Sequence, residues 1–78
     1  MKATSEEIMT IVKSGELSLE TKNLSTSASL RKAGLDSLDA SLLFLTIQEK
    51  YGLQVADEDV ARLDTVDAIV EFVNQQVA

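Results

Sequence analysis

The 78-residue sequence contains no cysteine and no histidine, and these two absences exclude several kinds of chemistry. Without cysteine the chain forms no disulfide and no thiolate metal site, and nothing in it requires an oxidising compartment. Without histidine a nucleophilic serine lacks its commonest base. A metal-binding cluster and a phosphate-cradling glycine loop are also missing from the sequence. The sequence therefore argues against an enzyme.

Long apolar runs are missing too. The sequence shows neither a charged-then-apolar leader nor the roughly 20 apolar residues that span a bilayer. We therefore expect a soluble, cytoplasmic protein with no membrane partner. The length suits one domain, residues 1–78, with a small hydrophobic core and modest stability.

The net charge of −6 is unevenly distributed along the chain. Residues 1–35 carry a balance of +1, and residues 36–78 carry a balance of −7. Such an acidic half repels nucleic acid and attracts positively charged partners. An acidic surface that only aids solubility explains the composition equally well.

Cap-forming residues and the spacing of apolar residues predict three longer helices and one short helix. The first begins at Thr4 or Ser5 and ends near Gly15, and the second covers about 37–51. Acidic residues 57–59 open the short third helix. The last begins at Asp64 or Thr65 and frays over 75–78. We expect an all-α fold, a small four-helix bundle.

A long polar segment separates the first two helices. Residues 15–36 are rich in Ser, Thr, Lys and Asn, and a loop of this length in a compact domain is commonly functional or disordered. Scattered leucines favour an ordered loop that is anchored on the bundle; they are Leu17, Leu19, Leu24 and Leu30. We expect the serines at 25, 27 and 29 to serve as turn and cap residues.

The second helix has two apolar stripes. One follows the helical repeat and is predicted to face the core: Ala40, Leu43, Phe44, Ile47 and Tyr51. The other is turned away from it: Leu38, Leu42 and Leu45. Because so small a bundle cannot easily bury a helix on all sides, we expect the second stripe to contact a partner, with local packing as the alternative.

The segment Gly34-Leu35-Asp36-Ser37-Leu38-Asp39 lies where the loop meets this helix. Gly34 allows a sharp turn, and either Asp36 or Ser37 can cap the helix. A serine or aspartate before an apolar helical run is most often only a cap. If Ser37 has chemistry, the lack of a nearby base indicates that it is modified rather than catalytic.

This segment resembles the attachment motif of acyl carrier proteins, in which the serine of Asp-Ser-Leu carries a 4′-phosphopantetheine arm. The resemblance extends over almost the whole chain and is strongest from about Leu30 to Val73. It implies a four-helix fold with a long first loop and phosphopantetheine on Ser37, flanked by Asp36 and Leu38. A phosphopantetheinyl transferase would load the arm from coenzyme A with Mg²⁺, and the thiol of the arm would carry a thioester.

The resemblance also implies partners, namely acyl-loading and acyl-processing enzymes such as synthases and transferases, with the carrier itself a monomer. The residues expected to contact them lie on the second and third helices: Asp39, Ser41, Leu42, Leu45, Gln48, Glu49, Asp57 and Glu58. A cavity between the helices would shelter part of the acyl chain, with Ile47 and Val66 as candidates for its lining.

The sequence departs from the fatty-acid type of carrier at several positions. Ser41, Leu42 and Gln48 stand where valine and acidic residues are common, Arg31 and Lys32 precede the motif where that type often has acids, and the residue at 56 is alanine where carriers often have proline. These changes argue against service to a general fatty acid synthase and suggest dedicated partners, as in a specialised lipid, polyketide or nonribosomal peptide pathway. The function that the resemblance implies is the carriage of acyl thioesters for fatty acid, polyketide or related specialised synthesis.

Two alternatives stay open at this point. A peptidyl or aminoacyl carrier of a nonribosomal peptide pathway shares the fold and the modified serine, either standalone or excised from a larger protein. A small acidic helical adaptor that is never modified is the alternative from another class.

Overall fold

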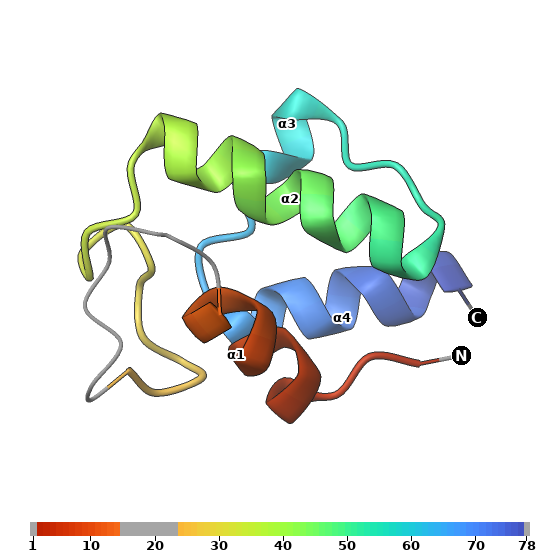
Figure 1. Cartoon of the computed structure of the whole chain (residues 1–78), viewed down its shortest axis with the longest axis horizontal. Helices are drawn as coiled ribbons and strands as arrows, with labels where there is room; N and C mark the ends of the chain where they lie inside the picture. The colour runs from red at the N-terminus through yellow and green to blue at the C-terminus, as the bar shows by residue number, and fades with distance from the viewer. Residues whose placement is uncertain (1, 15–23, 78) are drawn as a thin grey trace.

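Four helices make up the described part of this computed structural model, residues 2–14 and 24–77. They are α1 (Ser5–Ser14), α2 (Ser37–Tyr51), α3 (Asp57–Val60) and α4 (Val66–Val77), and no strand occurs within these residues. Helix α1 packs against both α4 and α2, and the short α3 lies beside α2 on the side away from α1 (Figure 1). The all-α fold with three longer helices and one short helix is as predicted.

The helix boundaries follow from their caps. Thr4 Oγ1 accepts a hydrogen bond from Glu7 N at 3.1 Å at the start of α1, and Thr65 Oγ1 accepts one from Ala68 N at 3.0 Å at the start of α4. Helix α2 ends at Tyr51, and the next residue, Gly52, has a left-handed φ of 65° and donates its N–H to the Gln48 carbonyl. The expected end of α1 at Gly15 lies outside the described residues.

One expectation for α4 is corrected, and the choice between its two candidate caps is decided. Helix α4 continues regularly to Val77, so residues 75–77 are not frayed. Asp64 is not its cap, because Thr65 caps the helix while the Asp64 carboxylate bonds to the loop before α2. The sequence offered both residues as caps, and contacts with a segment more than thirty residues away decided between them.

The core lies between α1, α2 and α4. Its fully buried side chains come from these helices, from the loop before α2 and from the start of α4: Ile8, Val12, Leu30, Leu43, Ile47, Val66, Ile69 and Val73. The predicted inner stripe of α2 is buried at Leu43, Phe44, Ile47 and Tyr51, and Ala40 is half-buried. Burial of these large apolar side chains is the main favourable term in folding.

The described part of the first loop, residues 24–36, is tied to the segment that leads into α4. Leu30 is fully buried and donates its N–H to the Asp64 carbonyl at 2.7 Å, and Asp67 N bonds to the Thr26 carbonyl at 3.0 Å. Leu24 is half-buried against the core. These two leucines are anchors as expected, whereas Leu17 and Leu19 lie outside the described residues.

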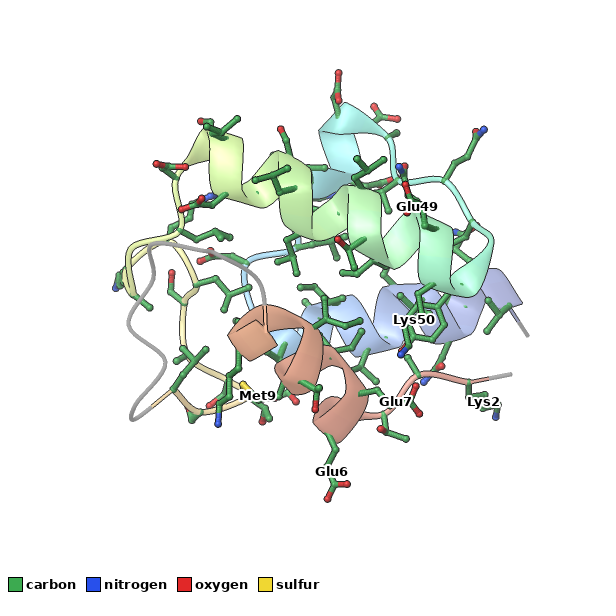
Figure 2. All side chains as sticks on the ribbon, in the orientation of Figure 1. Lys2, Glu6, Glu7, Met9, Glu49 and Lys50 are labelled. Carbon is green, nitrogen blue, oxygen red and sulfur yellow. The ribbon has the colours of Figure 1, made fainter. Side chains whose placement is uncertain are left out.

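The segment before α1 is hydrogen-bonded to α4. Ala3 N donates to Asn74 Oδ1 at 2.7 Å, and Asn74 Nδ2 donates back to the Ala3 carbonyl at 3.1 Å. Figure 2 shows Lys2 close to the end of α4 and Glu7 facing the end of α2. None of the helices in the described ranges is long and apolar enough to cross a bilayer.

Candidate functional site

The turn into α2 places Ser37 at the surface. Gly34 has a φ of 114°, which only glycine adopts easily, and its N–H bonds to the Arg31 carbonyl at 3.1 Å. Asp36 is the cap of α2, since its Oδ1 accepts a hydrogen bond from Asp39 N at 2.8 Å. Ser37 is therefore the first helical residue, and its side chain is exposed.

Because Asp36 supplies the cap, the Ser37 hydroxyl takes no part in capping the helix. It makes no hydrogen bond within the described residues, while the Ser37 carbonyl accepts one from Ser41 Oγ at 3.1 Å. The described residues also contain no group of three carboxylates that could hold a metal ion. This hydroxyl is accessible to an enzyme that modifies it, and no side chain of residues 2–14 and 24–77 accepts its hydrogen as a base would.

A groove of about 700 Å³ opens beside Ser37. Its lining comes from the loop before α2, from one side of α2 and from the α3 segment: Arg31, Leu35, Asp36, Ser37, Ala40, Ser41, Phe44, Leu45, Gln48, Val55, Asp57 and Val60. The walls are partly apolar and lead away from the serine. Such a groove can accept an apolar chain that is tethered at its mouth.

The two residues expected to line a cavity are not in this groove. Ile47 and Val66 are fully buried in the core, between α2 and the start of α4. Their place as candidates for lining an acyl cavity therefore stays a prediction. From the inner stripe only Ala40 and Phe44 line the groove, together with Gln48 and residues of the α3 segment.

The outer stripe of α2 is exposed as expected. Leu38 is 70% exposed, Leu42 50% and Leu45 49%, which are high values for leucines in a protein with so small a core. Together they form an apolar surface that begins beside Ser37 and follows α2 for about two turns. Local packing does not explain the stripe.

The residues expected to contact partners fall into three groups. Ser41, Glu49, Asp57 and Glu58 are exposed, and Figure 2 shows Glu49 projecting from α2 on a different side from Lys50. Gln48 is half-buried, and its Oε1 accepts a hydrogen bond from Val55 N at 2.7 Å, so it holds the segment before α3. Asp39 is only 6% exposed, which corrects its place among the contact residues.

The burial of Asp39 has a simple geometric cause. It lies one helical turn before Leu43, so it belongs to the inner stripe rather than to the outer one. Its acidic side chain suggests a surface contact, whereas its position in the helical repeat places it on the buried side.

The sequence did not reveal what Arg31 and Asp64 do. The Arg31 side chain lines the groove and reaches the end of α3, and Asp64 bonds to the loop at Ser29 and Arg31. No spacing rule links residues 33 positions apart, so only the folded chain shows this contact.

Comparisons with known proteins agree with this geometry. A family model described as a phosphopantetheine attachment site matches residues 6–73. An acyl carrier protein of Thermosynechococcus vestitus is 31% identical over 74 residues, covering 94% of this chain and 90% of its own length. An acyl carrier protein of Phytoplasma mali is 33% identical over 63 residues, covering 80% and 75%.

A solved structure shows the same fold. The acyl carrier protein from Enterococcus faecalis superposes with a TM-score of 0.70 at 22% identity, over 95% of this chain and 99% of that one. The match of the family model, the curated relatives and the shared all-helical fold lead to one conclusion. The chain belongs to the acyl carrier protein family, whose members carry acyl groups on phosphopantetheine and are not themselves catalysts.

Proposed function

We propose that Ser37 is the residue that carries 4′-phosphopantetheine, and that the chain presents acyl thioesters on this arm to dedicated enzymes. The observation that carries the assignment is the exposed Ser37 hydroxyl at the first position of α2, left without a hydrogen bond within the described residues because Asp36 caps the helix. The groove that opens beside Ser37 gives an attached apolar chain a place to lie.

The local electrostatics fit a phosphodiester at this position. The first turn of a helix has unpaired N–H groups and a partial positive charge, which tolerate an anion. The Asp36 carboxylate already accepts a hydrogen bond from one of these N–H groups, and its negative charge repels that of the phosphodiester. We infer that Asp36 contributes to the cap and to recognition by the transferase rather than to the stability of the modified state.

The chemistry supplied by the arm is a thiol that forms thioesters. The residues of this chain bind the arm at Ser37, shelter part of the acyl chain in the groove and present the outer stripe of α2 to partners. Tethering raises the effective concentration of the acyl group at each partner active site without any catalysis by the carrier.

We infer that Leu38, Leu42 and Leu45 form the docking surface, with Asp57 and Glu58 at its acidic edge. An exposed apolar stripe next to the attachment residue lets a partner bind both at once. Ser41 and Glu49 also belong to the exposed side of α2. We favour an acyl group as the cargo, within fatty acid, polyketide or related synthesis, because the groove is partly apolar and the curated relatives are named acyl carrier proteins.

The test is the intact mass after incubation with a promiscuous phosphopantetheinyl transferase, coenzyme A and Mg²⁺. We expect the wild-type chain and Ser41→Ala to gain one phosphopantetheine, and Ser37→Ala to gain none. Ser41 is the matched control, because it is an exposed serine one turn farther along α2. Loading of folded Ser37→Ala would overturn the assignment, and no loading of folded wild-type chain by several transferases would favour an unmodified adaptor.

A further inference from the structure

The α3 segment, residues 55–63, forms one wall of the groove, and its apolar contacts with the core come from Val55, Val60 and the buried Leu63. None of the four residues of α3 is buried, and Val60 is only half-buried against the core. Ala56 at the N-cap has no side-chain oxygen to cap the helix. So short a helix is not stable by itself, and its position depends on contacts from elsewhere in the chain.

Polar side chains hold this wall at both ends. Gln48 of α2 accepts a hydrogen bond from Val55 N at 2.7 Å, just before α3. At the other end, Arg31 Nη2 donates to the Ala61 carbonyl at 3.0 Å and makes a longer contact of 3.4 Å with the Val60 carbonyl. These carbonyls lie at the C-terminal end of α3, where the partial negative charge of a helix favours a cation.

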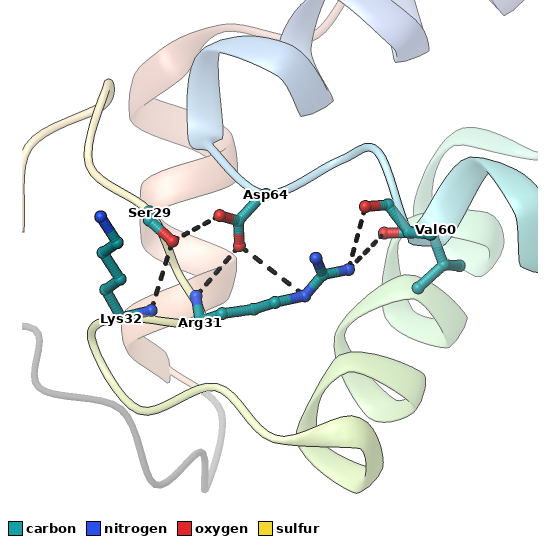
Figure 3. Close-up of polar contacts among 6 residues, drawn as sticks. Ser29, Arg31, Lys32, Val60 and Asp64 are labelled. Carbon is teal, nitrogen blue, oxygen red and sulfur yellow. Dashed lines mark hydrogen bonds and ion pairs between the residues drawn. The ribbon is translucent and has the colours of Figure 1, made fainter.

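Arg31 is itself fixed from the loop. Its backbone N donates to Asp64 Oδ1 at 3.0 Å, and its Nε lies 4.0 Å from the same oxygen (Figure 3). The Ser29 hydroxyl donates to the other Asp64 oxygen, and Ser29 Oγ accepts from Lys32 N at 3.2 Å. The Arg31 guanidinium therefore extends from a loop that is held by hydrogen bonds at Ser29, at Arg31 and at Lys32.

We propose that Arg31 is a positioning residue that holds the α3 wall where the groove can shelter an apolar acyl chain. Val55, Asp57 and Val60 contribute this wall, and Arg31 lines the same groove as Ser37. Without the guanidinium, the Val60 and Ala61 carbonyls lose a charged donor, and the wall keeps the Gln48 contact and the packing of Val55, Val60 and Leu63 against the core. An acyl chain attached through the arm at Ser37 then loses its contacts with the α3 wall. The proposal rests on the proposed function of Ser37.

The first experiment uses the unmodified chain and is independent of loading. Amide hydrogen exchange is compared in Arg31→Met and Lys32→Met, which remove the same charge from adjacent exposed residues. We expect Val60 and Leu63 amides, which are bonded within the α3 segment, to exchange about threefold to tenfold faster in Arg31→Met only. Amides of α1 and α4 should be unchanged in both variants. Equal exchange of the α3 segment in the two variants would overturn the proposal.

The second experiment measures how well the groove protects the acyl thioester from cleavage. The wild type and both variants are loaded with octanoyl- or acetyl-phosphopantetheine from the corresponding coenzyme A thioesters, and cleavage by hydroxylamine is followed by intact mass. We expect octanoyl cleavage in Arg31→Met to rise severalfold toward the acetyl rate, with acetyl cleavage unchanged and Lys32→Met equal to wild type. Arg31→Lys should fall between them, because lysine keeps the charge without the planar fork.

The two readouts separate the possible failures. Unchanged protection of the octanoyl thioester in Arg31→Met would show that the wall does not shelter the chain, even if the wall is looser. A protein that accepts no phosphopantetheine contradicts the proposed function of Ser37. Hydrogen exchange of the unmodified protein still decides whether Arg31 holds α3.

Discussion

The Tyr51 hydroxyl donates a hydrogen bond to Glu7 Oε2 at 3.0 Å and so joins the last turn of α2 to the first turn of α1. Burial of the phenol, the hydrogen bond to Glu7 and the negative charge of Glu7 together raise the pKa of Tyr51 to about 12. The folded chain therefore holds this proton more tightly than the unfolded chain does, whose tyrosine pKa is about 10.

This contact predicts a loss of stability in alkali. The contribution is fully present below about pH 10, and it is lost as the pH rises toward about 12, because the unfolded state releases the proton first. Denaturant unfolding at a series of pH values should show the decline, and Tyr51→Phe should flatten it. At neutral pH we expect Tyr51→Phe to lower the free energy of unfolding by about 1 kcal/mol. The same alkaline slope in both proteins would contradict the prediction.

Replacement of the α2 cap should destabilise the fold. Asp36 Oδ1 satisfies the N–H of Asp39, so Asp36→Ala leaves that donor without its partner and is expected to lower the free energy of unfolding by about 1 kcal/mol. Asp36→Asn keeps a cap and removes the charge, and it should stay close to wild type in urea unfolding. If both variants lose the same stability, charge rather than capping is responsible.

The outer stripe of α2 can be tested for docking. We expect Leu42→Glu and Leu45→Glu to lower kcat/KM for loading by a promiscuous transferase by about tenfold, because a charge replaces an apolar contact at the partner interface. Circular dichroism should show both variants folded, since half of each side chain is already in water.

Two controls define the meaning of that result. Gln76→Glu adds the same charge at an exposed position of α4 and should load normally. Ile47→Ala truncates a fully buried side chain of α2 and should cost about 2–5 kcal/mol of stability. If Leu42→Glu or Leu45→Glu unfolds the chain as Ile47→Ala does, the stripe is core and not a docking surface.

Gly52 should tolerate replacement poorly for a backbone reason alone. Its φ of 65° lies in the left-handed region, while a Cβ at this position would meet nothing within 4 Å. Gly52→Ala is therefore expected to cost about 1 kcal/mol through conformation and not through a clash. Gly52→Asn should cost less, since asparagine accepts this conformation more readily. Urea unfolding of the two variants compares them directly.

Much of α2 could be predicted because its signals are local. The repeat of Leu43, Phe44 and Ile47 identified the buried side, and the glycine after Tyr51 identified the end of the helix. The same repeat placed Asp39 on the buried side, although its charge had suggested a surface contact. Position in the helical repeat was the better guide there.

The sequence by itself determined the helices, the exposed leucines of α2 and the serine at its start, because hydrophobic periodicity and capping act over a few residues. The structure decided that Asp36 rather than Ser37 caps α2, and only its tertiary contacts show that Asp64 bonds to the loop and that Arg31 donates to the Ala61 carbonyl at the end of α3. Asp36 and Ser37 are equally good caps in isolation. The contacts of Arg31 and Asp64 join segments about 30 residues apart, which the folded chain brings together beside the buried Leu30.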